Sequence, residues 1–142
     1  MPMKKLAAAI TAALCLSAVH AQAEDIKVKV TAGDHVMTAT LQDNATARAF
    51  ASKLPMTLPM MDLYGREMCY RFPDALPANE VGTMGYDVGD IMYWTPRHSF
   101  VIMYEQNGEV IGGMQMVGRI DSGVEAFRST GDVKVTFELL KK

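Results

Sequence analysis

Two pairs of neighbouring residues, Arg71-Phe72 and Tyr93-Trp94, have side chains suited to recognising a ligand. A guanidinium group beside aromatic rings can hold a carboxylate or a carbonyl group while the rings cover an apolar part of the same ligand. These four residues are therefore predicted to form a binding surface for a small molecule or an extended peptide. The alternative is that Phe72 and Trp94 belong to the hydrophobic core and that Arg71 lies at its rim.

Two reactive residue types, a histidine and a cysteine, occur close to polar or charged neighbours. His98 precedes Ser99, but a general base needs a nucleophile and an orienting carboxylate near it in space. His98 is therefore expected to be a solvated turn residue. Cys69 lies between Arg66 and Arg71, whose charges would lower its pKa if the thiol were exposed; the alternative is a small, buried apolar side chain. No catalytic residue is assigned from these patterns.

Methionine is abundant, with twelve in 142 residues. Thioether sulfur binds copper(I), and a copper site would be built from His35, Met37, Met60 and Met61. The spacing of these residues fixes no third ligand, so packing is the favoured interpretation, because methionine fills irregular gaps in strands. Methionine-based copper handling is kept as a third functional hypothesis, and the sequence predicts neither a metal site nor a cofactor.

The first 23 residues have the features of a secretory signal peptide. Lys4 and Lys5 precede the apolar run 6–19, and the run is followed by the small-x-small cleavage site at 21–23. This run is shorter than the ~20 apolar residues that a membrane span needs. We therefore predict cleavage after Ala23, a periplasmic or secreted protein with no membrane association after cleavage, and one domain over residues 24–142.

The composition is that of an ordinary globular domain, with 49% hydrophobic and 21% charged residues. Loss of the two leader lysines changes the formal net charge from −2 to −4. An acidic surface attracts neither nucleic acid nor anionic lipid, because both need clustered positive charge. Since Cys15 lies in the leader, Cys69 has no partner for an internal disulfide. The sequence leaves the oligomeric state open.

Alternating apolar and polar residues between turn signals predict about eight short strands. Their expected bounds are 26–30, 36–41, 56–58, 66–72, 91–94, 100–104, 114–120 and 133–139. One helix is expected to start after Asp43 or Asn44, to present Phe50 and Leu54 on its apolar face, and to end before Pro55. This pattern favours a mainly β, closed or nearly closed barrel with the helix plugging one end, and an open sandwich is the alternative.

Several stretches of the mature chain resemble a known family, and the most specific of them is Gly-Arg-Ile-Asp-Ser-Gly-Val-Glu at 118–125. The others are 44–47, 63–65, 85–96 and 100–104. Over residues 26–140 the chain is similar to the bacterial cyclophilin-like domain family, a small family distinct from the true cyclophilins. The resemblance implies an eight-stranded cyclophilin-type barrel. Within 118–125, Gly118, Asp121 and Gly123 are expected to shape a turn where the chain leaves a strand.

The resemblance does not imply prolyl isomerase activity. True cyclophilins carry a catalytic arginine in a Phe-His-Arg stretch that is followed by Phe-Met-x-Gln-Gly-Gly. This chain has Tyr70-Arg71-Phe72, and no Gln-Gly-Gly follows. We therefore expect a binding module without the usual isomerase site, and a weak or divergent peptidyl-prolyl isomerase that uses Arg71 is the alternative function.

Overall fold

The computed structural model describes residues 25–140 of the chain. The strands in this range are β1 (Ile26–Ala32), β2 (His35–Leu41), β3 (Met56–Leu63), β4 (Glu67–Arg71), β5 (Gly82–Met84), β6 (Asp90–Trp94), β7 (Ser99–Met103), β8 (Ile111–Ile120) and β9 (Val133–Leu139). The α-helix is α2 (Ala45–Ala51), and the two 3-10 helices are η2 (Thr95–Arg97) and η3 (Val124–Arg128). The signal peptide expected at residues 1–23 lies outside the described residues and stays a prediction.

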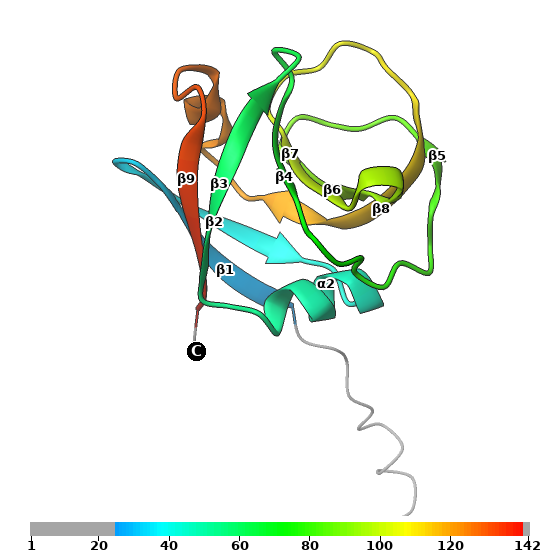
Figure 1. Ribbon diagram of the computed structural model, residues 1–142. Coiled ribbons are helices and arrows are strands. Elements are labelled where there is room, and N and C mark those ends of the chain that lie inside the picture. The colour runs from blue at the N-terminus through cyan, green and yellow to red at the C-terminus, as the bar shows by residue number, and fades with distance from the viewer. Residues whose placement is uncertain (1–24, 141–142) are drawn as a thin grey trace, which may run out of the picture.

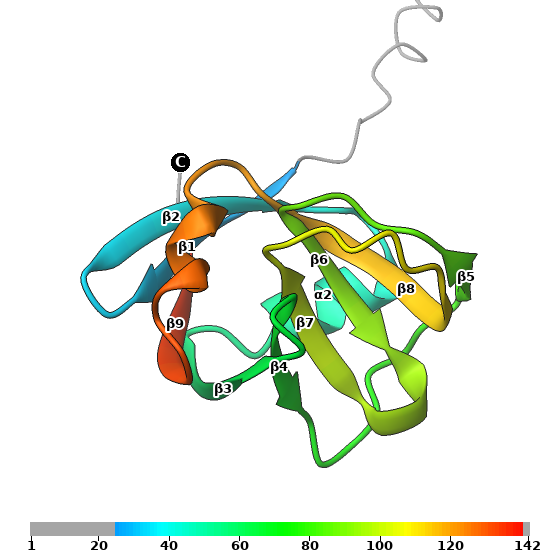
Figure 2. The same cartoon turned by 90° about the horizontal axis from the view of Figure 1, so that it is seen from above.

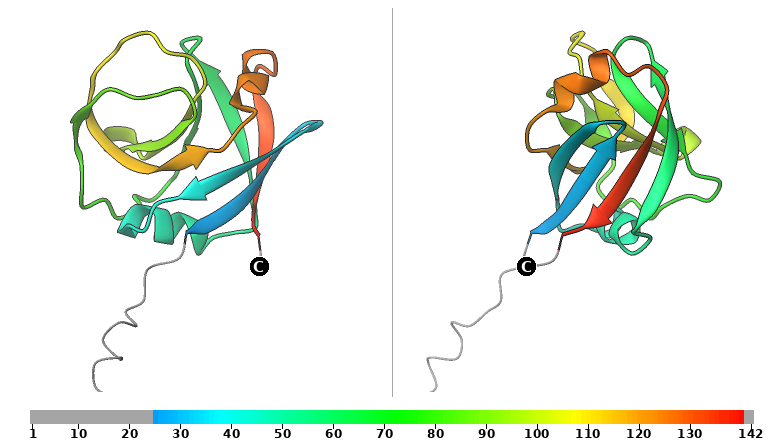
Figure 3. Two further views of the ribbon diagram at one scale, coloured as in Figure 1. Left: turned by 180° about the vertical axis from the view of Figure 1, so that it is seen from behind. Right: turned by 90° about the vertical axis from the view of Figure 1, so that its left-hand side faces the viewer.

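Eight of the strands close into an antiparallel barrel (Figure 1). Neighbouring strands follow the order β2-β1-β9-β3-β4-β7-β6-β8, and pairing of β8 with β2 completes the ring. Figure 3 shows β1, β9 and β3 side by side along one wall of this barrel. The predicted mainly β, eight-stranded barrel with one α-helix is confirmed, and the open sandwich is excluded.

A ninth strand, β5, lies outside the ring and pairs with the first residues of β8. The strand bounds expected from the sequence left the stretch between residues 72 and 91 without a strand. A three-residue strand that begins with a glycine is too short for an alternating pattern to be visible. Its extended conformation comes from pairing with β8, where Gly82 is opposite Met114.

The barrel closes where β2 and β8 meet, and Gly118 makes this contact tight. Gly118 is opposite Leu41, and a Cβ atom on Gly118 would lie 2.4 Å from the carbonyl oxygen of Thr40. The expectation that Gly118 shapes a turn is wrong, because it lies inside β8 and is needed there for close backbone approach. Gly123 does occupy a turn, with φ of 93° immediately before η3, and Asp121 follows the end of β8.

Helix α2 closes one end of the barrel, as predicted. The Asn44 side chain accepts a hydrogen bond from the backbone N–H of Ala47 at 2.9 Å, which caps the helix. Phe50 points into the barrel, where its ring stacks on Phe100 at 4.2 Å and meets Phe137 edge-on at 5.3 Å. In Figure 2, which looks down on the molecule, α2 lies within the outline of the strands.

A second hydrophobic cluster lies apart from the barrel core. It comprises Cys69, Tyr86, Met92, Val101, Met103 and Met114. On β4, β6 and β7 these side chains alternate with residues that point into the barrel, so the cluster covers the outer face of the sheet. This sheet is therefore apolar on both faces.

The four residues considered for copper do not share one surface. Met37 and Met60 are buried in the barrel core, whereas His35 and Met61 are exposed. Within residues 25–140, no group of three or more His, Cys, Asp and Glu side chains is placed to hold a metal ion. None of the helices in the same range is both long enough and apolar enough to cross a membrane.

Candidate functional site

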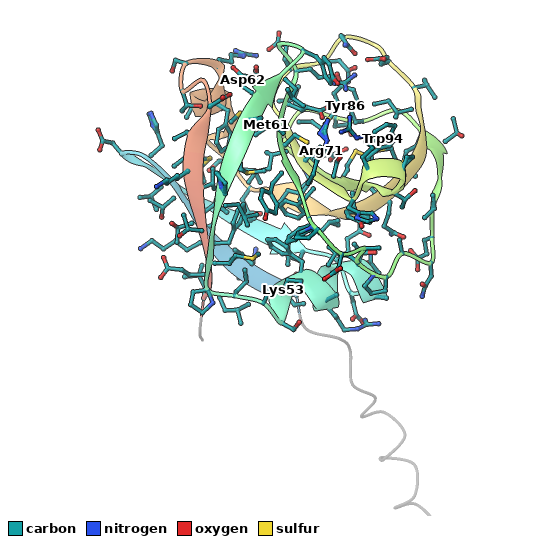
Figure 4. The ribbon with its side chains drawn as sticks, in the orientation of Figure 1. Lys53, Met61, Asp62, Arg71, Tyr86 and Trp94 are labelled. Carbon is teal, nitrogen blue, oxygen red and sulfur yellow. The ribbon has the colours of Figure 1, made fainter. Side chains whose placement is uncertain are left out.

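A cavity of about 350 Å³ lies on the outer face of the strands β4, β7, β6 and β8. Its lining combines apolar, aromatic and charged side chains: Tyr64, Arg66, Glu67, Arg71, Trp94, Ser99, Val101, Glu109, Ile111 and Met114. In Figure 4, Arg71 and Trp94 lie inside the ring that the chain draws around this face in that view. The volume is at the lower end of the range for small-molecule sites.

Strand pairing brings Arg71 and Trp94 to this face. Arg71 on β4 is opposite Ser99 on β7, and Ser99 is opposite Trp94 on β6. Trp94 is in turn opposite Met114 on β8. Directly paired residues of neighbouring strands point to the same side of a sheet, so these four side chains form one row across the cavity.

The Arg71 guanidinium has an unsatisfied donor in this row. Its Nε is buried and has no hydrogen-bond partner, and it is the one such buried side-chain nitrogen or oxygen among the described residues. Its Nη1 donates to the Cys69 sulfur at 3.6 Å, which is a weak acceptor. None of the ion pairs described for residues 25–140 involves Arg71. Arg71 as a whole is only half-buried and lines the cavity, so a carboxylate bound there would accept from the terminal nitrogens of its guanidinium.

The Trp94 ring forms an apolar wall and is held in one orientation. Its Nε1 donates to the carbonyl oxygen of Gly112 at 2.9 Å. The following residue, Thr95, donates through Oγ1 to the carbonyl oxygen of Gly113 at 3.0 Å. Both bonds tie the end of β6 to the start of β8. Trp94 is also the single tryptophan of the chain, so its fluorescence reports on this cavity alone.

Arg66, Glu67 and Glu109 form a cluster of charges at the other end of the cavity. The Arg66 Nη2 lies 2.6 Å from the Glu67 Oε1, and Arg66 also pairs with Glu109. Arg66 and Glu67 are buried, while Glu109 is exposed. Burial raises the pKa of Glu67, against the opposing effect of the Arg66 guanidinium. The exposed ring of Tyr64 lies over Arg66, with 5.1 Å from the guanidinium carbon to the ring centroid.

Phe72 and Tyr93, predicted as members of the site, lie in the barrel core instead. Phe72 is 8% exposed and meets the Phe100 ring at 6.2 Å. Tyr93 is 1% exposed, and its hydroxyl accepts a hydrogen bond from the backbone N–H of Leu76. Consecutive residues of a strand point to opposite sides of the sheet. One member of each predicted pair therefore lines the cavity, and the other fills the core.

Sequence reasoning did not include Glu67, Ser99 and Glu109 in the site. Glu67 was detectable in principle, because it has the same parity as Arg71 within one strand. Ser99 was not, because its place in the site depends on which strand pairs with β4. Glu109 lies in the loop before β8, and it reaches the cavity through its contact with Arg66.

Cys69 and His98, the two residues of reactive type, are both withdrawn from solvent and held by contacts within the fold. Cys69 is buried, and burial raises the pKa of its thiol despite the opposing charge of Arg71. His98 is half-buried rather than solvated, and its Nδ1 lies 3.1 Å from the carbonyl oxygen of Phe72. The backbone N–H of Phe72 bonds the carbonyl oxygen of His98 in return, at 2.9 Å. The turn after β6 is thereby held against the end of β4.

Comparisons with known proteins agree with this architecture. The solution structure of a hypothetical protein from Archaeoglobus fulgidus superimposes with a TM-score of 0.67 at 17% identity, covering 84% of this chain and 98% of that one. At this identity the likeness shows the fold alone. A search of curated proteins gives no match. A family model described as the cyclophilin-like family matches residues 30–138. The chain therefore belongs to the cyclophilin-like family.

Proposed function

We propose that the protein is a binding module whose outer cavity takes a small molecule with a carboxylate next to an apolar body. The observation that carries this proposal is that Arg71 lines a cavity with apolar walls and has no carboxylate partner among the described residues. If the predicted leader is cleaved, this module acts in the periplasm or outside the cell.

The carboxylate is favoured because of what Arg71 lacks. A buried donor without an acceptor costs about 1–3 kcal/mol, and within the described residues Arg71 has only the weak Cys69 sulfur as an acceptor and no carboxylate to balance its charge. Carboxylates match the planar fork of a guanidinium and accept two parallel hydrogen bonds. The apolar body would lie against Trp94, Val101 and Met114, which line the same cavity.

A second candidate function uses the same arginine. Peptidyl-prolyl isomerisation needs a twisted amide held in an apolar groove, with a hydrogen-bond donor near the proline nitrogen. Arg71 is a free donor beside apolar side chains, which supports this alternative. A protease-coupled isomerase assay on residues 24–142 tests it. Turnover that is lost in Arg71→Ala would support the isomerase, and equal rates in both proteins would exclude Arg71 from the reaction.

The binding proposal is tested with matched pairs of small ligands. A panel of aliphatic and aromatic carboxylates and their primary amides is titrated into the wild-type protein by calorimetry. We expect carboxylates to bind about 10- to 100-fold more tightly than their amides, since a hydrogen bond to a charged group contributes about 1.5–3 kcal/mol. Equal affinities for the members of each pair, or no binding of any carboxylate, would overturn the proposal.

Two variants assign the binding to the cavity. Arg71→Met is expected to bind carboxylates no more tightly than amides. Arg128→Met is the matched control, because Arg128 is exposed and pairs with Glu105 outside this cavity. Retained carboxylate preference in Arg71→Met would also contradict the proposal. The comparison within the wild-type protein does not depend on whether a variant folds.

A further inference from the structure

We propose that the ligand of this cavity is a zwitterion, whose carboxylate binds Arg71 and whose ammonium group binds beside Glu67 and Glu109. This inference rests on the proposed binding function and specifies the other end of the ligand. It follows from the charges that line the cavity, which have opposite signs at its two ends.

The end of the cavity away from Arg71 carries an excess of negative charge. Glu67 and Glu109 both contact the single guanidinium of Arg66. One arginine compensates one of the two carboxylates, so the cluster has a formal charge of −1. The Arg71 end has a formal charge of +1, since Arg71 has no carboxylate partner. A ligand with one charge of each sign is complementary to both ends.

The separation of the two ends follows from β4. Glu67 and Arg71 are four residues apart on the same face of this strand, but the Arg71 guanidinium leans back along the strand, where its Nη1 donates to the Cys69 sulfur. Cys69 is two residues from Glu67, so the two charged groups are separated by about 7 Å at about 3.3 Å per residue. A free α-amino acid carries both charges on one carbon and is too short for this separation, whereas an extended dipeptide with free termini has the required length. Its apolar side chains would face Val101, Ile111 and Met114, which line the cavity.

The acidic end has a second feature that suits an ammonium group. The Tyr64 side chain is 70% exposed and already has the Arg66 cation over its ring at 5.1 Å. A cation close to an aromatic face is stabilised by the charge distribution of the ring. Tyr64 and Glu109 both line the cavity, and both lie in connections between strands, Tyr64 between β3 and β4 and Glu109 between β7 and β8. An incoming ammonium group would therefore meet a carboxylate and a ring at the same end.

The test compares three dipeptides that differ at their ends. Leucyl-phenylalanine has both charges, its N-acetyl derivative keeps the carboxylate alone, and its C-terminal amide keeps the ammonium alone. We expect the free dipeptide to bind about threefold to tenfold more tightly than the N-acetyl form, the gain expected of a partly exposed charge pair. The amide is expected to bind more weakly than both.

The Glu109→Gln variant tests whether the Glu109 carboxylate binds the ammonium group. In this variant the free and N-acetyl dipeptides are expected to bind with equal affinity. Glu105→Gln is the matched control, because Glu105 is an exposed carboxylate that pairs with Arg128 outside this cavity. It should retain the wild-type preference.

The outcomes separate this inference from the proposed function. Equal affinities of the free and N-acetyl dipeptides in the wild-type protein would overturn the zwitterion and leave the carboxylate site standing. The same holds if simple carboxylates of the panel bind and the free dipeptide does not. Failure of every carboxylate to bind would overturn both proposals.

Discussion

Replacing Arg71 by methionine tests whether this arginine stabilises the fold or serves ligand binding instead. Methionine fills a comparable apolar volume and has no donor. The replacement removes the buried Nε that lacks an acceptor, a defect that costs about 1–3 kcal/mol. It also removes the weak bond to the Cys69 sulfur and the attraction between Arg71 and Glu67. We therefore expect the free energy of unfolding to rise by about 1 kcal/mol.

The assay is equilibrium unfolding in denaturant without ligand, with the denaturant dependence of the unfolding free energy checked for each protein. Arg128→Met is the control, because its exposed guanidinium forms an ion pair of little expected consequence. Its unfolding free energy should change by no more than about 0.5 kcal/mol. A loss of more than about 1 kcal/mol in Arg71→Met would refute the reasoning, since Arg71 would then be stabilising the fold itself.

Three further predictions follow from other contacts. Gly118→Ala should lower the unfolding free energy by about 1–3 kcal/mol in denaturant titrations, because the new Cβ meets backbone atoms of β2. Gly82→Ala is the control and should change the unfolding free energy little, because its new Cβ lies 3.7 Å from the nearest side-chain atom. Burial and the Asp62 carboxylate raise the pKa of Tyr104 to about 12, so stability should fall as the pH rises from about 10 towards that value, and Asp62→Asn should lower this pKa in an absorbance titration of tyrosinate. Cys69 should resist thiol reagents in the folded protein and react on unfolding, because it is buried; rapid labelling of the folded protein would contradict its placement.

The elements of the barrel were predictable from the sequence where an alternating pattern is long enough. Buried residues occupy every second position from Val28 to Ala32 in β1 and from Met37 to Leu41 in β2, and the cap at Asn44 marks the start of α2. β5 and the role of Gly118 were not predictable. Both depend on what β8 meets in space, namely β5 along one part and the backbone of β2 along another.

The candidate site was predictable in part, for the same reason. The sequence suggested a guanidinium next to aromatic residues, and the structure places Arg71 and Trp94 in one row through the strand order β4-β7-β6. The alternation of side chains within a strand excludes Phe72 and Tyr93 from that row. Glu109 reaches the cavity because a residue distant in sequence holds its loop in place: the backbone N–H of Asn107 donates to the Tyr86 hydroxyl at 3.0 Å.

The most direct test of the central claim is the fluorescence of Trp94, the single tryptophan of the chain, during titration with hydrocinnamate and with its primary amide. If the cavity binds an apolar carboxylate through Arg71, hydrocinnamate will give a saturable change in Trp94 emission. The amide will give the same change only at about 10- to 100-fold higher concentration, and Arg71→Met will remove the difference between them. Unchanged emission with both compounds, or identical titrations of the two in the wild-type protein, would contradict the claim.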